Sequence, residues 1–166
     1  MMLLRHMLAI LLLPFMVVVV VPYLLLTATS YPVGDITDLA TRWGDDLPLR
    51  LLGVILFTGG LALFCWCVAF FAKVGRGTLA PWDPTQELVA AGPYRHVRNP
   101  IISGVVMMLF GQALFWASWA IAIWAALVLL INHMYFVSIE EPGLEERFGA
   151  SYINYKARVP RWIPRW

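Results

Sequence analysis

A long stretch without formal charge constrains this chain more than any other feature. No Asp, Glu, Lys or Arg occurs between Ile101 and Ile139. A helix needs about 20 apolar residues to cross a bilayer core of about 30 Å, so this stretch is long enough for two helices. We expect the turn between Gly111 and Ser118. The first arm would then be only about 22 Å long, so it would either thin the bilayer locally or cross it incompletely.

Two earlier segments are also long and apolar, Met7–Leu26 and Leu49–Ala72. The first is longer than the apolar region of a signal peptide, which is about 7–15 residues. The chain of 166 residues is 61% hydrophobic and only 13% charged, which excludes an ordinary soluble domain. We therefore predict a single all-α integral membrane domain, residues 1–166, with about four transmembrane helices. Their ranges are 7–26, 49–72 and the hairpin 101–139, with a connection 73–100 and a C-terminal tail 140–166.

The distribution of charge predicts the orientation of these helices. Basic residues dominate the segment Lys73–Asn99 and the tail, whereas the loop between the first two apolar segments contains four Asp. Lys and Arg are enriched on the cytoplasmic side, so we expect the connection, the tail and both termini there, in a bacterial cytoplasmic membrane. The net charge of +2 gives no indication of nucleic-acid binding.

Two polar blocks flank the uncharged stretch. The first is Gly92–Pro100, and the second runs from Glu140 to Pro160. If the stretch between them is a hairpin, both blocks return to the same face of the bilayer and can form one site. For Asn99 and Pro100 a simpler reading stays open, because Asn and Pro are common at the N-cap and first position of a helix.

His133, Glu140 and Glu141 are candidates for chemistry. His133 lies seven residues before Glu140, which places both on one face of a regular α-helix. Polar residues in an apolar helix usually face a bundle interior or a cavity, although His133 could simply bond to a neighbouring helix. The two glutamates oppose the dipole at a helix C-terminus, so we expect a compensating cation. Nearby arginines or a bound sulfonium would both satisfy this.

The order of these motifs resembles one family. It comprises Gly92-Pro93-Tyr94, Arg98-Asn99-Pro100, Gly104, Glu140-Glu141, Phe148-Gly149 and Arg158-Val159-Pro160. Together they resemble the isoprenylcysteine carboxyl methyltransferase and phospholipid methyltransferase superfamily, in particular its small bacterial members, over roughly residues 73–164.

The resemblance implies S-adenosylmethionine as cofactor, in a pocket on the cytosolic side. The matching cofactor-binding positions are Gln86, Leu88, Val89, Tyr94, Arg98, Asn99, Pro100, Ile101, Ile102, Gly104 and Glu140. Four departures concern the pocket and the acceptor. Asn99 stands where many members have His, Ile102 where Tyr is usual, and Gln86 and Phe136 replace His and Arg of the eukaryotic carboxyl methyltransferases.

We therefore predict in-line methyl transfer to a membrane-embedded lipid or lipidated acceptor that offers a carboxylate, amine or thiol. Glu140 would contact the cofactor. Glu141, His133 and Arg98 are the candidate catalytic residues, with Glu141 or His133 orienting the acceptor or taking its proton. We expect no metal site. Two alternatives remain at this point: a nicotinamide-dependent membrane reductase related to sterol reductases, and a membrane subunit without catalytic activity.

Overall fold

All regular secondary structure in the described part of the chain is helical, as predicted. The computed structural model describes residues 13–29, 47–74 and 88–164, without the side chains of 71–74. The elements in chain order are η1 (Met16–Val20), α2 (Val21–Ala28), α4 (Leu47–Val74), η2 (Gly92–Arg95), α5 (Pro100–Phe115), α6 (Trp119–Tyr135), η3 (Phe136–Glu140), α7 (Glu141–Phe148) and α8 (Ala150–Arg158). Here η1 and η3 are π-helical and η2 is a 3₁₀ turn.

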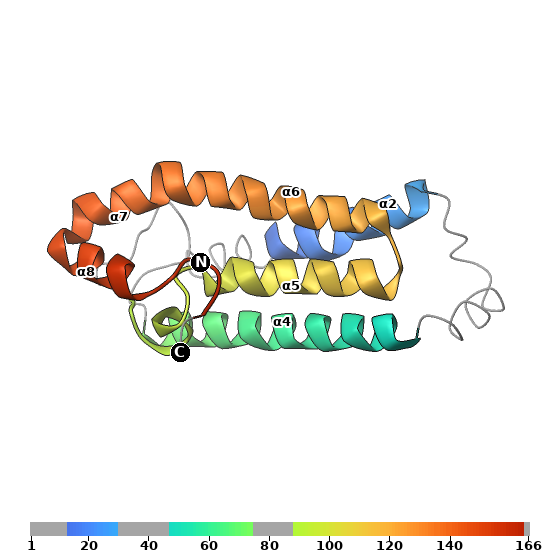
Figure 1. The fold of residues 1–166 in the computed structure, drawn as a ribbon, viewed down its shortest axis with the longest axis horizontal. Helices are drawn as coiled ribbons and strands as arrows, with labels where there is room; N and C mark the ends of the chain where they lie inside the picture. Colours follow the sequence, from blue (N-terminus) through green and yellow to red (C-terminus); the bar gives the residue numbers. More distant parts are fainter. Residues whose placement is uncertain (1–12, 30–46, 75–87, 165–166) are drawn as a thin grey trace, which may run out of the picture.

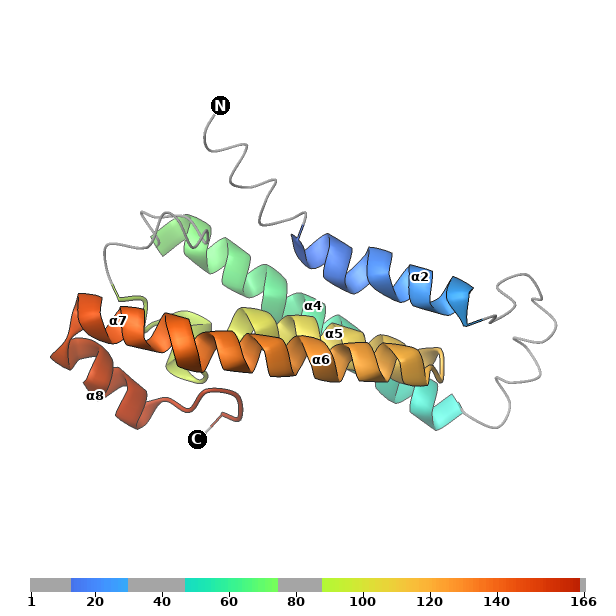
Figure 2. The same cartoon turned by 90° about the horizontal axis from the view of Figure 1, so that it is seen from above.

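The long helices run side by side along one direction (Figures 1 and 2). The segment η2 and the helices α7 and α8 gather at one end of the bundle, which we call the polar end. The turn between α5 and α6 lies at the opposite end, which we call the far end (Figure 1). The hairpin therefore returns the chain to the end from which it started, and it brings the two polar blocks to the same place.

Two helical stretches are long and apolar enough to cross a membrane, Leu47–Phe70 and Trp119–Phe148. Two shorter apolar helices, Leu13–Ala28 and Pro100–Phe115, accompany them. The fold is that of a helical membrane protein, and the total of four spans stays a prediction. The hairpin turns at residues 116–118, inside the predicted interval. Its first arm, α5, has 16 residues and is therefore about 24 Å long.

Glycine brings α4 and α5 into direct backbone contact. A Cβ atom on Gly60 would lie 2.6 Å from the carbonyl oxygen of Gly104, and one on Gly53 would lie 2.7 Å from that of Gly111. In the opposite direction, a Cβ atom on Gly104 would lie 2.8 Å from the Gly60 oxygen, and one on Gly111 would lie 2.7 Å from the Gly53 oxygen. We call these four residues the glycine interface. Lipid tails are as apolar as leucine, so helices in a membrane associate through such close packing.

A π-helical turn precedes proline in two places. In η1 the amide of Val21 bonds to Met16 O, five residues back, and Pro22 follows. In η3 the amide of Glu141 bonds to Phe136 O, and Pro142 follows. Proline lacks an amide hydrogen and its ring clashes with the carbonyl of the preceding turn. The wider turn accommodates that ring without ending the helix, so α6, η3 and α7 are continuous.

The carbonyl groups that Pro22 and the π turn release are bonded by the hairpin. Gln112 Nε2 donates to Val18 O at 2.9 Å, and Trp124 Nε1 donates to Val17 O at 3.0 Å. An unbonded carbonyl in a bilayer core costs several kcal/mol. These two side chains therefore join the first described helix to α5 and α6.

Candidate active site

Glu141 is the centre of the polar end. Its Oε1 lies 2.7 Å from Arg98 Nη1 and 2.7 Å from Arg161 Nη2, and its Oε2 lies 3.0 Å from Lys156 Nζ. We call these four side chains the polar cluster. Arg98 belongs to the first polar block, whereas Lys156 and Arg161 belong to the second. The two blocks meet, as the hairpin predicted.

Backbone and tyrosine contacts hold the same segments together. The amide of Arg98 donates to Pro160 O at 2.9 Å, and the Tyr155 hydroxyl donates to Tyr94 O at 2.6 Å. Gly149, with a φ of +51°, reverses the chain between α7 and α8, a conformation that favours glycine. This reversal folds the tail back so that Pro160 lies against Arg98, just before α5.

Burial makes the charge balance of the polar cluster important. The Glu141 side chain is 4% exposed and that of Arg98 is 8% exposed. Lys156 is more exposed and also pairs with Glu145 at 2.6 Å. Hydrogen bonds to Glu145 and to Glu141 raise the pKa of Lys156, which keeps this ammonium protonated. A buried carboxylate is tolerated when cations and hydrogen bonds surround it, and removal of one partner is costly.

Glu140 has a different environment from its neighbour. Because consecutive side chains on a helix point about 100° apart, the Glu140 side chain does not join the polar cluster, and it is exposed. Among the described residues it has no ion-pair partner. The predicted pair of glutamates therefore consists of one engaged and one accessible carboxylate.

Arg98 has a buried hydrogen-bond donor without an acceptor among the described residues. Its Nη1 donates to Glu141 and, at 3.5 Å, to the Tyr152 hydroxyl. Its Nε is buried and has no acceptor among the described residues. An unpaired guanidinium N–H is suited to an anionic group such as a carboxylate.

The other predicted cofactor-binding residues are near the start of α5 or just before it. Asn99 is the N-cap of α5 and Pro100 its first residue, although the Asn99 side chain makes no capping bond. Ile101, Ile102, Leu88 and Val89 are half-buried, whereas Gly104 is buried against Gly60 in the glycine interface. That contact explains the glycine without a ligand. Gln86 lies outside the described residues.

Tyr94 is half-buried in the turn η2, and its carbonyl accepts a hydrogen bond from Tyr155. Burial, followed by the nearby Cys67, Tyr155 and Glu140, raises its pKa. Its phenol therefore stays neutral at physiological pH. Such a ring can pack against a ligand or donate a hydrogen bond, but it cannot serve as a base.

His133 is bonded to a residue that the sequence did not single out for the site. Trp162 Nε1 donates to His133 Nδ1 at 3.1 Å, and the ring centroids are 6.2 Å apart. Trp162 follows the second polar block, and nothing in its local sequence marks it as a partner of His133. The π-helical turn η3 lies between His133 and Glu140 and adds a residue to the helix, so the two no longer share one face as in a regular α-helix.

The sequence also did not select Lys156 and Arg161 from the basic tail. Six Lys and Arg residues lie from Arg95 to Arg161, and all are plausible partners for a glutamate by type alone. Only the return of the chain at Gly149 brings Lys156 and Arg161 to Glu141. No local pattern distinguishes them from Arg158.

The fold and the site define a helical membrane protein whose two polar blocks form one cluster at the end of a bundle. The chain belongs to the phospholipid methyltransferase family, which it matches over residues 49–151. It is also similar to methanethiol S-methyltransferase 2 of Bradyrhizobium diazoefficiens, with 35% identity over 75 residues. That match covers 43% of this chain and 27% of the relative, so the chain spans about a quarter of the relative's length. Neither match supports the reductase alternative.

Proposed function

We propose that this protein is an S-adenosylmethionine-dependent methyltransferase whose active site is the polar end of the bundle and whose acceptor is membrane-soluble. Membership of the phospholipid methyltransferase family supports methyl transfer. The observation that supports this location is the meeting of the two polar blocks at Glu141, which pairs with Arg98, two residues before the start of α5. This is where a water-soluble donor and a lipid-soluble acceptor can both arrive.

The described residues fit the cofactor in two respects. The unpaired Nε of Arg98 can bind a carboxylate, and the exposed carboxylate of Glu140 can bind an ammonium or lie near a sulfonium. Tyr94, Leu88, Val89 and the first turn of α5 supply apolar surface for the remainder. The proposed cofactor-binding set therefore keeps the residues of the sequence prediction: Gln86, Leu88, Val89, Tyr94, Arg98, Asn99, Pro100, Ile101, Ile102, Gly104 and Glu140.

When bound, the cofactor supplies an electrophilic methyl group on sulfur, which an acceptor atom with a lone pair takes by in-line displacement. The protein has to align the reactants and exclude water. We assign Glu141 to holding Arg98 in place, since three cations already occupy its carboxylate. His133 would orient the acceptor. Its Nδ1 accepts from Trp162, so in the neutral ring the proton is on Nε2, which can donate to an acceptor atom.

We propose the acceptor only by chemical class: a carboxylate, amine or thiol on a lipid or a lipid-soluble molecule. The name of the similar protein from Bradyrhizobium adds a small thiol to the acceptors worth testing. A thiolate or carboxylate needs no further proton removal, whereas an ammonium must first lose one.

The test combines binding with turnover. Purified protein is incubated with cofactor carrying a labelled methyl group and, in separate samples, a total lipid extract or methanethiol. We expect label in an acceptor product from at least one sample. In parallel, calorimetry should show cofactor binding that Glu140→Ala weakens and Glu146→Ala leaves unchanged, because Glu146 is exposed on α7 and forms none of the ion pairs of the polar cluster. Absence of both binding and transfer would refute the proposal.

A further inference from the structure

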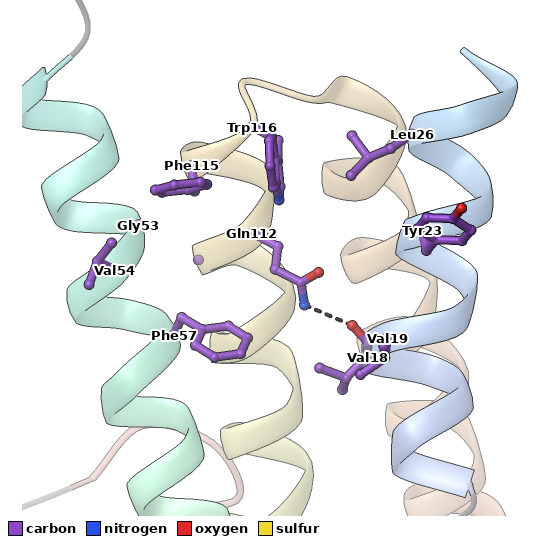
Figure 3. Close-up of a pocket in the computed structure, with 11 residues that line it drawn as sticks. Val18, Val19, Tyr23, Leu26, Gly53, Val54, Phe57, Gln112, Phe115 and Trp116 are labelled. Atoms are coloured by element: carbon purple, nitrogen blue, oxygen red, sulfur yellow. Dashed lines mark hydrogen bonds between the residues drawn. The ribbon is translucent and has the colours of Figure 1, made fainter. Parts of the chain in front are cut away.

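A cavity lies in the membrane part of the molecule, away from the polar cluster. Its volume is about 460 Å³, within the range of about 300–1,000 Å³ usual for ligand sites. Figure 3 shows the side chains that line it, which come from η1 and α2 on one side, α4 on the other, and the end of α5 between them. The lining residues are Val18, Val19, Tyr23, Leu26, Gly53, Val54, Phe57, Gly111, Gln112, Phe115 and Trp116.

The lining offers little to a polar ligand. Gln112 is the only amide side chain in it, and its Nε2 already donates to Val18 O at 2.9 Å, as the dashed line in Figure 3 shows. The remaining polar atoms belong to Tyr23 and Trp116, whose rings are amphipathic. A cavity of this kind selects a hydrocarbon.

The position of the cavity along α5 places it in the half of the bilayer that is farther from the polar cluster. Gly111 lies eleven residues after Pro100, or about 16 Å at the rise of an α-helix. The midplane of a core of about 30 Å is about 15 Å from either face. The α5 part of the lining, from Gly111 to Trp116, therefore begins near the midplane and continues toward the far end.

The cavity opens sideways to the lipid. Val54 is 44% exposed, Val19 is 47% exposed and Tyr23 is 61% exposed, and they stand on the two helices that face each other across it. The arm α5, at about 24 Å, is shorter than the bilayer core. Its end, at Phe115 and Trp116, lines the cavity between α2 and α4.

We propose that this cavity binds one hydrocarbon chain of a membrane lipid whose headgroup lies at the far end, in the leaflet opposite the polar cluster. A void lined by apolar side chains forfeits dispersion contacts, and a chain from the surrounding leaflet restores them. Trp116 is the C-cap of α5, at the far end, and Tyr23 is exposed, and amphipathic rings favour the region close to headgroups. A lipid held by its headgroup at the polar cluster would have to extend through its own leaflet first. The proposal does not depend on the methyltransferase activity.

The test is photo-crosslinking of the full-length protein in phosphatidylcholine vesicles. Two phosphatidylcholine probes are used, one with a diazirine near the glycerol and one with a diazirine at the end of an acyl chain. Labelled positions are then mapped by mass spectrometry. We expect the glycerol-proximal probe to label Leu26 and Trp116, and the chain-end probe to label Val18 and Gln112. The opposite order would show a lipid that enters from the polar end and would overturn the proposal, as would the absence of label from all four.

A pair of substitutions on one helix provides the control. Val54 lines the cavity, whereas its neighbour Ile55 is 65% exposed and does not. Val54→Trp fills the cavity and should abolish most labelling of Gln112 and Trp116, while Ile55→Trp should leave it unchanged. Val19→Trp, from the opposite wall, should repeat the loss if Val54→Trp does not fold. Unchanged labelling in a folded Val54→Trp or Val19→Trp protein would refute the proposal.

Discussion

The glycine interface and the polar cluster hold the same bundle together by opposite means. In the glycine interface, α4 and α5 approach because four side chains are absent, and the closest Cβ positions would be 2.6–2.8 Å from a carbonyl oxygen of the facing glycine. In the polar cluster, one buried carboxylate of Glu141 gathers three cations from distant segments. Neither uses the hydrophobic effect as its main source of specificity.

The surroundings explain the difference. Within the bilayer, lipid competes equally for apolar side chains, so only close packing and hydrogen bonds favour one helix partner over another. At the polar end water competes for every charge, so an ion pair stabilises the fold only where the chain excludes water from it. The glycine interface should therefore be sensitive to volume, and the polar cluster to charge.

The largest effect should come from Glu141→Gln. It keeps the shape of the side chain but leaves Arg98 and Arg161 without their common carboxylate. Breaking a buried ion pair in this way costs about 3–5 kcal/mol. The measurement is unfolding in detergent micelles. Glu145→Gln is the control, with an expected change of about 0–1 kcal/mol, since among the described residues Glu145 pairs only with the more exposed Lys156. If the two substitutions lower the free energy of unfolding equally, the polar cluster contributes no more than ordinary surface ion pairs.

The next largest effect on stability should come from added side-chain volume at two adjacent glycines of α4. A Cβ on Gly60 meets Gly104 O at 2.6 Å, whereas on Gly59 it meets only the end of Met107 at 3.5 Å. We expect Gly60→Ala to lower the free energy of unfolding by about 1–3 kcal/mol. Gly59→Ala should be neutral or slightly stabilising, because alanine favours helix. The two proteins are compared by thermal unfolding. A Gly60→Ala protein as stable as the original would contradict the close contact between α4 and α5.

Gln112→Leu and Trp124→Phe test the hydrogen bonds that join the first helix to the hairpin. Each removes a donor to a carbonyl of η1 that Pro22 or the π turn has released. Bonds of this kind between membrane helices contribute about 0.6–1.7 kcal/mol, so each change should be in that range. Thr58→Val is the control, because Thr58 bonds only within its own helix, to Val54 O and Ile55 O. If all three behave alike, these bonds do not hold η1 in place.

Trp162→Phe removes the donor to His133 and leaves an aromatic ring. We expect a loss of about 0.5–1.5 kcal/mol, the net contribution of one hydrogen bond. A double-mutant cycle with His133→Leu isolates the contact, because the two changes should cost less together than the sum of their separate effects. Strict additivity would show that Trp162 and His133 do not interact in solution.

The smallest effect concerns Lys156 at alkaline pH. Its pKa is raised by hydrogen bonds to Glu145 and Glu141, so the folded state holds this proton more tightly than the unfolded state. The stabilisation is complete below the ordinary lysine pKa of 10.5 and is lost as the pH rises through the raised value. The amplitude should be small because the side chain is 38% exposed. The measurement is the free energy of unfolding across this pH range. The decrease should be absent in Lys156→Arg, because arginine stays protonated.

Much of the fold was available from local properties of the chain. The uncharged stretch from Ile101 to Ile139 predicted the hairpin, and its turn at residues 116–118 is confirmed. Asn99 and Pro100 begin α5, and Gly149 ends α7, as their conformational preferences predict. Pro142 is suited to the first turn of a helix, but the π turn before it keeps α7 continuous with α6.

The sequence by itself therefore determined that apolar helices would bring two polar blocks to one end, because apolar length and charge are properties of a segment and its solvent. The tertiary structure decided the partners. It selected Lys156 and Arg161 for Glu141, paired Gly60 with Gly104 and placed Trp162 on His133. Such pairings depend on distances between segments far apart along the chain, and no local pattern of residue types contains those distances.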